Sequence, residues 1–510
     1  MKRCKRNILL FICVFAAKIL YAQQVGDTVY HSGFLQKDTM WQNAGGCRYR
    51  YVSKDGKDVV LIKKGMLKIP FAAAPYAGTK IAVNVRLKSN GVSEKPRPWN
   101  GVKVMVHIPV PWDDLYPQTD FTTDAFDWKQ AGFNAFVPAG ADTFWLCLGL
   151  EKVTGKIWID EVTLTVSEAA PKLPETIKTD AVYKGHAEKR LRGMMVPTNI
   201  ADTDITTLAQ WGANHIRWQL TWDGFPRSKA DTAREFAYRQ WVNNCLQHID
   251  KLLPQCRKAG IRLVIDMHSL PGGRFPNEVT HRLFHDTAWQ RVFRDVWKQI
   301  ALRYKNEPAV WGYDLANEPE EGIVPAGLMN WQQLATAAAQ DIRTIDTTHA
   351  IIVEGAPRGG PEALARMEPI PVKGVVYSFH MYVPALFTHQ GVDFDDSSRY
   401  PGVIQGREWN ITTMRKTFEQ VRRWQQTYNT HIYVGEFSAI RWATAQSAYY
   451  YLRDCIDLFE EYEWDWAYHA FREWQGWSIE HTELKNNELP AAIPTERQML
   501  LMKWFGWNKD

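Results

Sequence analysis

The sequence has no surplus of charge of either sign once its first segment is set aside. The chain of 510 residues carries a formal net charge of +5, and residues 1–22 hold five basic residues and no acidic one. Beyond residue 22 the basic and acidic side chains therefore balance. A nucleic acid or another polyanion selects a basic surface, so the sequence predicts no partner of that kind.

Paired cysteines are also missing. Five of the seven cysteines lie beyond residue 22, and none of them has a C-x-x-C spacing or another spacing typical of metal ligands. A zinc-ribbon type of metal site is thereby excluded. One alternative is a disulfide bond between Cys47 and Cys147 in the first part of the chain. Otherwise these cysteines are predicted to be small buried apolar residues.

No apolar run has the full length of a membrane span. Basic residues near the N-terminus precede an apolar run at residues 8–17, and the small residue Ala22 follows. This order is typical of a secretory signal peptide, so residues 1–22 are predicted to be removed. The mature chain is then extracytoplasmic, secreted or periplasmic, with no stable membrane insertion. Lys18 interrupts the end of the run, which leaves an uncleaved anchor as the alternative.

Residues 25–168 contain no convincing amphipathic helix. Their short apolar or alternating runs, such as residues 59–62, 81–85 and 104–108, are separated by Gly, Pro and Asn. This pattern predicts an all-β sandwich. Residues 169–189 contain prolines and scattered lysines, and are predicted to be a linker.

After the linker, apolar runs alternate with long helical patterns, of which residues 286–304 are the clearest. This alternation is the βα signature of a parallel sheet. There are eight strand candidates, so residues 190–510 are predicted to form a (β/α)8 TIM barrel of the α/β class. The candidates are residues 193–197, 215–220, 261–267, 310–316, 350–353, 375–379, 431–435 and 464–470.

Two of these strands end in a carboxylic acid. Asn317 and Glu318 follow one strand, directly before Pro319, and Glu436 ends another, in the run HIYVGEF. Side chains at the C-terminal ends of barrel strands point into the mouth of the active site. Two strand-end carboxyls on one scaffold are what retaining glycoside hydrolysis requires. Glu354 is a third strand-end carboxyl, for which a positioning or structural role is favoured.

Five ordered motifs, IRW, DMHSLPGG, YDLANEP, FHMYVP and VGEFSA, are spread over most of residues 190–480. Together they resemble glycoside hydrolase family 5, the cellulase-like family of clan A. The resemblance implies that Glu318 is the general acid/base and Glu436 the nucleophile. It also implies that Asn317 holds the sugar 2-hydroxyl and that Arg217 contacts the nucleophile.

The same resemblance assigns further residues to the cleavage subsite, namely His268, His380 and Tyr382. The family also places a Trp at strand eight as the floor of this subsite. Here the run YHAFREWQGW departs from the usual W-x-W pattern. The family's Trp therefore aligns with Phe471, Trp474 or Trp477. Trp474 is preferred. No catalytic metal or organic cofactor is implied.

Residues 127–165 resemble the last strands of jelly-roll carbohydrate-binding modules, with the signature WIDEV at 158–162. In such folds the acidic pair, here Asp160 and Glu161, often lies near a structural calcium. Some of the 23 tryptophans of the chain are candidates for stacking on sugar rings. Those in this region are Trp99, Trp112 and Trp145, for which packing within the domain or against the barrel is favoured.

The sequence therefore predicts an endoglucanase-type retaining β-glycosidase, which cleaves a β-linked polysaccharide or oligosaccharide by double displacement. Glu436 must be ionised, and Glu318 must begin protonated with a raised pKa. The insert at residues 384–408 is predicted to wall one side of the cleft. The alternatives are a non-catalytic carbohydrate-binding protein on a degenerate barrel, and a transglycosylase that uses the same residues.

Overall fold

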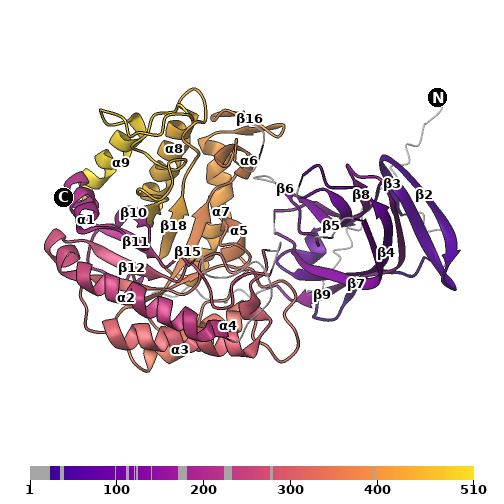
Figure 1. Cartoon of the computed structure of the whole chain (residues 1–510), viewed down its shortest axis with the longest axis horizontal. Helices are drawn as coiled ribbons and strands as arrows, with labels where there is room; N and C mark the ends of the chain where they lie inside the picture. Colours follow the sequence, from indigo (N-terminus) through magenta and orange to yellow (C-terminus); the bar gives the residue numbers. More distant parts are fainter. Residues whose placement is uncertain are drawn as a thin grey trace, which may run out of the picture.

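The computed structural model of the chain describes residues 23–509 apart from 35–39, 98, 111–113, 120, 122–123, 139, 171–180, 223–232, 276–278, 393 and 395–396. The predicted signal peptide lies outside the described residues, as do residues 171–180 of the predicted linker. Figure 1 shows an all-β part beside a larger part of strands and helices. In the described part of the chain, no helix combines the length and apolar character needed to cross a membrane.

The first part is a sheet of nine antiparallel strands. Its order is β6-β5-β8-β3-β9-β4-β7, with β1 paired to β9 and β2 paired to β3. Burial alternates along β4, because successive side chains point to opposite faces, and one face covers an apolar core. The strands are β1 (Thr28–Ser32), β2 (Gln42–Lys54), β3 (Lys57–Ala72), β4 (Lys80–Val92), β5 (Gly101–Pro109), β6 (Asp114–Leu115), β7 (Asp124–Phe136), β8 (Thr143–Glu151) and β9 (Lys156–Glu168).

The all-β prediction for this part is confirmed, and its kinship to carbohydrate-binding modules stays a prediction. All cysteines of the described residues are free and buried, including Cys47 and Cys147. The disulfide option is therefore wrong, and the interpretation of the cysteines as small buried residues is confirmed.

The second part is a closed barrel of eight parallel strands, which confirms the predicted fold. All eight predicted strands agree with the observed ones to within two residues at either end. The strands are β10 (Arg192–Val196), β11 (His215–Gln219), β12 (Arg262–Asp266), β13 (Val310–Asp314), β14 (Ala350–Glu354), β15 (Val375–Met381), β18 (Ile432–Phe437) and β19 (Asp465–Tyr468).

One helix follows each barrel strand and covers the outside of the barrel. In α3 the side chain of Asp286 caps the first turn by accepting from the N–H of Ala288, which is why this helix begins where the sequence predicts. The helices are α1 (Asp202–Trp211), α2 (Ala233–Ala259), α3 (Thr287–Tyr304), α4 (Trp331–Arg343), α5 (Pro361–Leu364), α7 (Ile411–Tyr428), α8 (Ser447–Glu461) and α9 (Glu496–Gly506).

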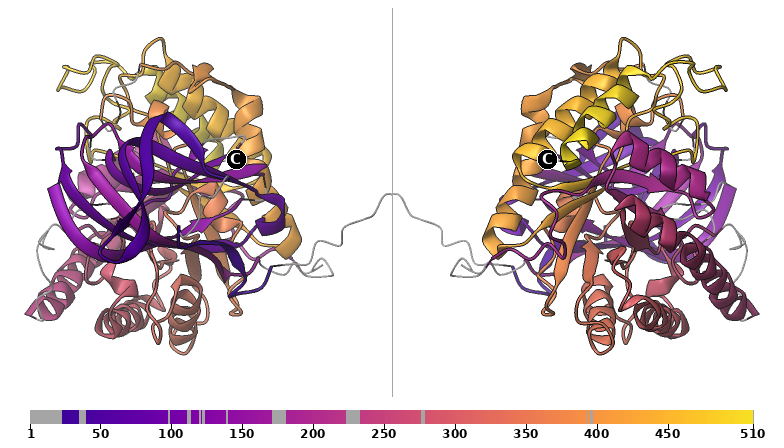
Figure 2. Two further views of the ribbon diagram at one scale, coloured as in Figure 1. Left: turned by 90° about the vertical axis from the view of Figure 1, so that its right-hand side faces the viewer. Right: turned by 90° about the vertical axis from the view of Figure 1, so that its left-hand side faces the viewer.

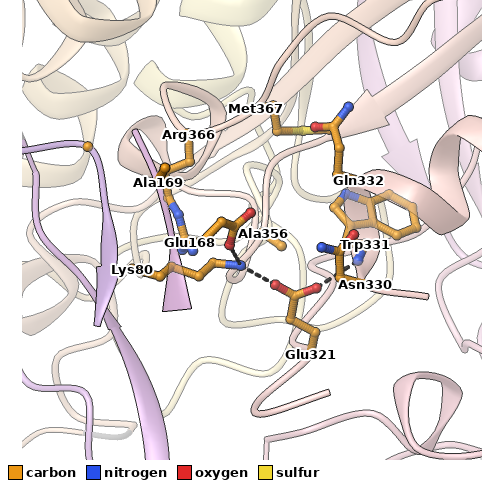
Figure 3. Close-up of a pocket in the computed structure, with 11 residues that line it drawn as sticks. Lys80, Glu168, Ala169, Glu321, Asn330, Trp331, Gln332, Ala356, Arg366 and Met367 are labelled. Carbon is orange, nitrogen blue, oxygen red and sulfur yellow. Dashed lines mark hydrogen bonds and ion pairs between the residues drawn. The ribbon is translucent and has the colours of Figure 1, made fainter. Parts of the chain in front are cut away.

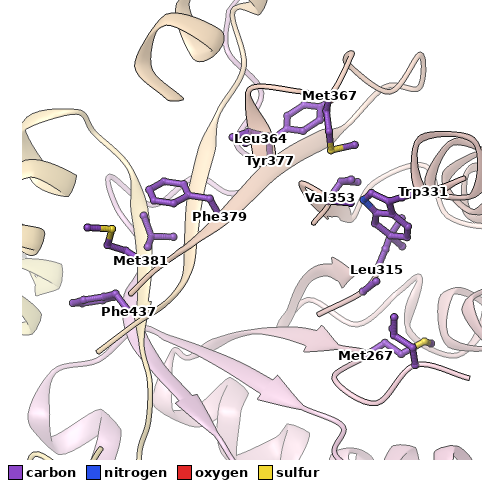
Figure 4. Packing of buried hydrophobic residues seen from close by; sticks show 14 of the residues in the cluster. Met267, Leu315, Trp331, Val353, Leu364, Met367, Tyr377, Phe379, Met381 and Phe437 are labelled. Carbon is purple, nitrogen blue, oxygen red and sulfur yellow. The ribbon is translucent and has the colours of Figure 1, made fainter. Parts of the chain in front are cut away.

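Large apolar side chains fill the space between strands and helices. Phe379 of β15 contacts Phe418 of α7, and Phe437 of β18 contacts Phe459 of α8, with ring centroids 5.7 and 5.0 Å apart. Figure 4 shows Phe379 and Phe437 among the buried apolar side chains. A smaller apolar cluster fills the barrel interior, and Trp311 is its largest side chain. The barrel is therefore a packed scaffold, and its chemistry must lie at the strand ends.

The sheet docks on loops that follow strands β13, β14 and β15. Lys80 of β4 lies between Glu168, at 2.5 Å, and Glu321 of the loop after β13 (Figure 3). The amide of Asn134 donates to the carbonyl of Gly322 at 3.1 Å in the same loop. Figure 2 shows the sheet in front of the barrel when viewed from its own side.

The insert at residues 384–408 also joins the two parts. It contains α6 (Ala385–Thr388), β16 (Gly402–Ile404) and most of β17 (Arg407–Trp409). Arg407 donates to the Asp114 carboxylate and the Val110 carbonyl, both of the first part. Tyr400 is buried and donates to Asp454, so this residue serves packing. Whether the insert also walls the cleft stays a prediction.

Replacing Lys80 by methionine is expected to lower the free energy of unfolding by about 3 kcal/mol, because it leaves the buried Glu321 carboxylate without its cation. Adding Glu321→Gln should recover most of the loss, since an amide oxygen still accepts from the N–H of Trp331. Urea unfolding of both variants measures this. Lys54→Met, which removes an exposed ion pair to Asp55, is the control, and an equal effect of the two lysine changes would contradict the prediction.

Candidate active site

The polar strand-end residues predicted from the sequence meet at one end of the barrel. Arg217 lies in β11, His380 in β15 and Glu436 in β18, while Glu318 follows β13 by four residues. The pair Arg217 and Glu436 is almost fully buried, and Glu318 is more open, with 29% of its side chain exposed. The structure therefore places these side chains around one small mouth of the barrel.

Glu436 is surrounded by donors. Its Oε1 accepts from Nη1 of Arg217 at 2.5 Å, and its Oε2 accepts from the hydroxyl of Tyr382 at 2.8 Å. Three imidazoles lie near its carboxylate, with distances of 4.0 Å to His268, 3.7 Å to His380 and 3.6 Å to a histidine at the end of β19. Burial alone would raise the pKa of Glu436, but the neighbouring imidazoles and the guanidinium outweigh it and hold the pKa well below its ordinary value.

Arg217 is held by acceptors on several strands. Its Nε donates to Asp314 at 2.9 Å, and its Nη2 lies 3.1 Å from Asp266. The same Nη2 donates to Glu354 at 3.0 Å and to Asn317 Oδ1 at 3.1 Å. Arg217 thus sits in a buried ion network and also contacts Glu436.

Asp266 and Asp314 are residues of this network that the sequence analysis did not assign. Asp266 also accepts from Nδ1 of His268 at 2.9 Å, and so orients that ring. The sequence did contain a signal for Asp266. Asp266 and His268 are two residues apart at the end of one strand, so their side chains face the same way. Nothing in the sequence indicated that Asp314 shares a partner with Asp266.

Glu318 has a backbone that few residues adopt. Its φ is 46°, in the left-handed region, which costs of order 1–3 kcal/mol in a residue other than glycine. Its N–H donates to Oε2 of Glu354 at 2.9 Å, so Glu354 fixes this bend. This contact agrees with the positioning role favoured for Glu354, and it turns the Glu318 carboxylate toward Glu436.

The imidazole of His380 lies between the carboxylates of Glu318 and Glu354. Its Nδ1 is 3.0 Å from Oε1 of Glu318, and its Nε2 is 3.1 Å from Oε1 of Glu354. An oxygen of Glu318 and an oxygen of Glu436 lie within 4.8 Å of each other and of a ring nitrogen of His380. These three groups have donor types that bind metals, but hydrogen bonds to Arg217 and Tyr382 already engage Glu436. The absence of a cofactor stays a prediction.

The pKa of Glu318 differs from the expectation. Burial and the charge of Glu436 raise it, but the hydrogen bond and the charge of His380 outweigh them, so the pKa lies below its ordinary value. Burial alone would lower the pKa of His380, whereas the neighbouring carboxylates raise it well above its ordinary value. The expected raised pKa of Glu318 is therefore wrong in this arrangement, because the hydrogen bond to Nδ1 of His380 favours the ionised form of the Glu318 carboxyl.

At strand eight the residue beside Glu436 is His469, which the sequence analysis missed. Its Nδ1 is 2.5 Å from the hydroxyl of Tyr382. The tryptophan that packs on Tyr382 is Trp477, with ring centroids 6.1 Å apart. Trp474, the preferred candidate, is 39% exposed and packs edge-on against Trp477 and Trp442. Its role in binding sugar stays a prediction.

The tryptophan candidates of the first part differ in their surroundings. Trp99 is 41% exposed, and its ring lies 6.0 Å from that of Phe394 in the insert, which agrees with packing against the barrel. Trp145 is half-buried in β8, and Trp112 lies outside the described residues.

Asp160 and Glu161 do not have the surroundings of a calcium site. Asp160 forms ion pairs with Arg86 and, at 3.2 Å, with Lys57, whereas Glu161 is exposed. Calcium takes six to eight oxygen ligands, several of them carboxylates. Because two cations already neutralise the one buried carboxylate here, these side chains do not fit the implied ion.

Comparison with known proteins agrees with this fold and identifies a family. Residues 181–480 match the family model of cellulase, glycosyl hydrolase family 5. A pair of strand-end carboxyls on one barrel is the arrangement that glycoside hydrolysis uses. The chain belongs to glycosyl hydrolase family 5, and it is an enzyme that hydrolyses O-glycosyl bonds.

Two relatives illustrate the range of similarity. Endoglucanase C of Acetivibrio thermocellus is 30% identical over 292 residues, which span 52% of this chain and 82% of that protein. Cellodextrinase A of Ruminococcus flavefaciens is 24% identical over 257 residues, which span 49% of this chain and 71% of that protein. The crystal structure of a glycoside hydrolase matches with a TM-score of 0.50 and 22% identity over 62% of this chain and 99% of that one, a likeness of fold alone.

Proposed function

We propose that the chain is a retaining β-glycosidase of the endoglucanase type, which cleaves β-linked glucan chains or oligosaccharides. The observation that carries this proposal is the separation of the two carboxylates, whose nearest oxygens lie within 4.8 Å. Retaining enzymes hold their carboxyl groups about 5–5.5 Å apart, and inverting ones about 6.5–9.5 Å. The names of the relatives, an endoglucanase and a cellodextrinase, support β-glucan as the substrate.

In the first step, the ionised Glu436 attacks the anomeric carbon and the bond to the leaving oxygen breaks. The proton shared by His380 and Oε1 of Glu318 passes through Glu318 to that leaving oxygen. Arg217 and Tyr382 hold the attacking carboxylate in place, so it needs no reorganisation during the reaction.

In the second step, water replaces Glu436 at the anomeric carbon. Glu318, now without its proton, takes a proton from this water, and the electron pair of the broken bond returns to Glu436. Asn317 is buried beside Arg217, which orients its amide oxygen and leaves the amide N–H₂ as the donor for the sugar 2-hydroxyl. Two inversions give a product that keeps the configuration of the substrate.

The stereochemistry of the product tests this function. Proton NMR during hydrolysis of cello-oligosaccharides should show the β-anomer of the new reducing end first, with the α-anomer following by mutarotation. If the α-anomer forms first, the retaining mechanism is wrong. Binding without hydrolysis across a panel of β-linked polysaccharides would favour the degenerate barrel, and transfer products with an added acceptor sugar would favour a transglycosylase.

We also propose that the chain acts outside the cytoplasm, after export by the pattern at residues 1–22. A polymeric β-glucan is too large for ordinary uptake, so an enzyme that cleaves it is useful only where the polymer is. N-terminal sequencing of the mature protein should begin at Gln23.

A further inference from the structure

Four side chains form one row that begins at the nucleophile. The hydroxyl of Tyr382 is 2.8 Å from Oε2 of Glu436 and 2.5 Å from Nδ1 of His469. On the other side of the ring, Nε2 of His469 lies 3.0 Å from Oε2 of Glu473. His469 and Glu473 stand where the resemblance predicts an aromatic floor, and the proposed mechanism does not use them.

The row contains three hydrogen bonds, and each needs its own proton. A neutral tyrosine supplies one, and a neutral imidazole supplies one more. If Tyr382 donates to Glu436, then Nδ1 of His469 must donate to Tyr382. Nε2 of a neutral ring would then be an acceptor that faces the carboxylate of Glu473. The third proton therefore resides on Nε2 or on one of the two carboxylates.

Both carboxylates are ionised at neutral pH. The pKa of Glu436 lies well below its ordinary value, for the reasons given above. Burial raises the pKa of Glu473, but the hydrogen bond and the charge of His469, a hydrogen bond from Gln219 and the charge of His268 outweigh burial and lower it. Burial and the charge of Glu436 raise the pKa of Tyr382 well above its ordinary value, so Tyr382 stays neutral. The third proton is left to Nε2.

We propose that His469 is an imidazolium, held by Glu473, that positions Tyr382 and supports the nucleophile Glu436 as a leaving group. This inference rests on the proposed function and deepens it. In the second step the bond between the anomeric carbon and Glu436 breaks, and its electron pair returns to the carboxylate. A cation 3.6 Å from Oε2 makes the carboxylate a weaker base, and so a better leaving group.

Other groups around His469 do not replace this charge. The ring of Trp477 lies beside it, with centroids 5.9 Å apart, and offers an apolar surface. The backbone N–H of His469 donates to the carbonyl of Phe437 at 3.1 Å, which fixes the residue to β18. His268 and His380 approach Glu436 from other strands, so they remain in place when His469 changes.

The decisive variant is Glu473→Gln. Its amide can donate to Nε2, so three hydrogen bonds are satisfied with a neutral imidazole and the geometry is kept. On 2,4-dinitrophenyl β-cellobioside, kcat/KM reports formation of the glycosyl-enzyme, and kcat reports its hydrolysis when that step is slow. We expect kcat to fall about 30-fold and KM to fall with it, while kcat/KM changes less than about threefold. Rapid mixing should show a burst of dinitrophenolate.

His469→Gln gives a second measurement, because it removes the ring charge and keeps a donor to Tyr382, and the same split is expected. Glu480→Gln is the matched control, since Glu480 lies in the same segment and binds Arg472 at 2.9 Å. Equal losses in kcat and kcat/KM for Glu473→Gln would overturn the inference and leave the proposed function standing. No turnover by the unchanged enzyme, on this glycoside or on any β-glucan, would overturn both.

Discussion

Replacing Glu436 by alanine is expected to lower kcat on β-glucan by about five orders of magnitude. The variant removes the group that attacks the anomeric carbon and leaves Arg217 and Tyr382 around an empty space. A small anion such as azide fits that space. Added azide should restore part of the activity on an activated aryl glycoside and give an α-glycosyl azide, because only one inversion then occurs.

The measurement is the rate of reducing-sugar release, with NMR of the azide product. Glu419→Ala, on the exposed face of α7, is the control for handling and expression. Residual activity within a hundredfold of the unchanged enzyme would assign the nucleophile to another residue. A β-glycosyl azide would place Glu436 in the role of acid/base.

Replacing Glu318 by alanine is expected to have an effect that depends on the leaving group. A poor leaving group, such as the sugar alcohol of a glucan, needs the proton of Glu318, so kcat should fall about 10⁴-fold. Dinitrophenolate leaves without a proton, so formation of the glycosyl-enzyme on its glycoside should be nearly unchanged. The slow step becomes attack of water, which has lost its base.

Azide needs no general base, so it should accelerate turnover of the Glu318→Ala variant and give a β-glycosyl azide by two inversions. The comparison of polymer and dinitrophenyl glycoside measures the effect. Equal losses on both substrates would contradict the acid/base role. His380→Gln should weaken the same dependence only in part, because it removes the partner of the shared proton and keeps Glu318.

The sequence alone predicted the barrel and the principal carboxylates, and the physical reason is burial. Strands of a parallel barrel are covered on both faces, so they are apolar runs that a single sequence reveals. A carboxylic acid at the end of such a run has no structural cause in the run itself. Glu318 and Glu436 therefore stand out, and the structure brings their side chains together.

The rest of the site depends on contacts that no local pattern contains. Asp314 shares the guanidinium of Arg217 with residues of three other strands. His469 lies beside Glu436 because β18 and β19 are neighbours. The sequence analysis preferred Trp474 instead, because the family places a Trp at strand eight. The pKa of Glu318 depends on the distance to His380, which sequence spacing does not give.

The docking of the sheet on the barrel changes what the boundary at residues 169–189 means. Many secreted hydrolases carry modules on tethers that can be exchanged without loss. Here the loop that follows Glu318 ends on the sheet, where Lys80 neutralises Glu321 and Asn134 holds Gly322. The loop's shape is thus a joint property of both halves, and recombination at this boundary would separate the general acid from part of its support. At this boundary the sheet and the barrel therefore behave as one structural unit.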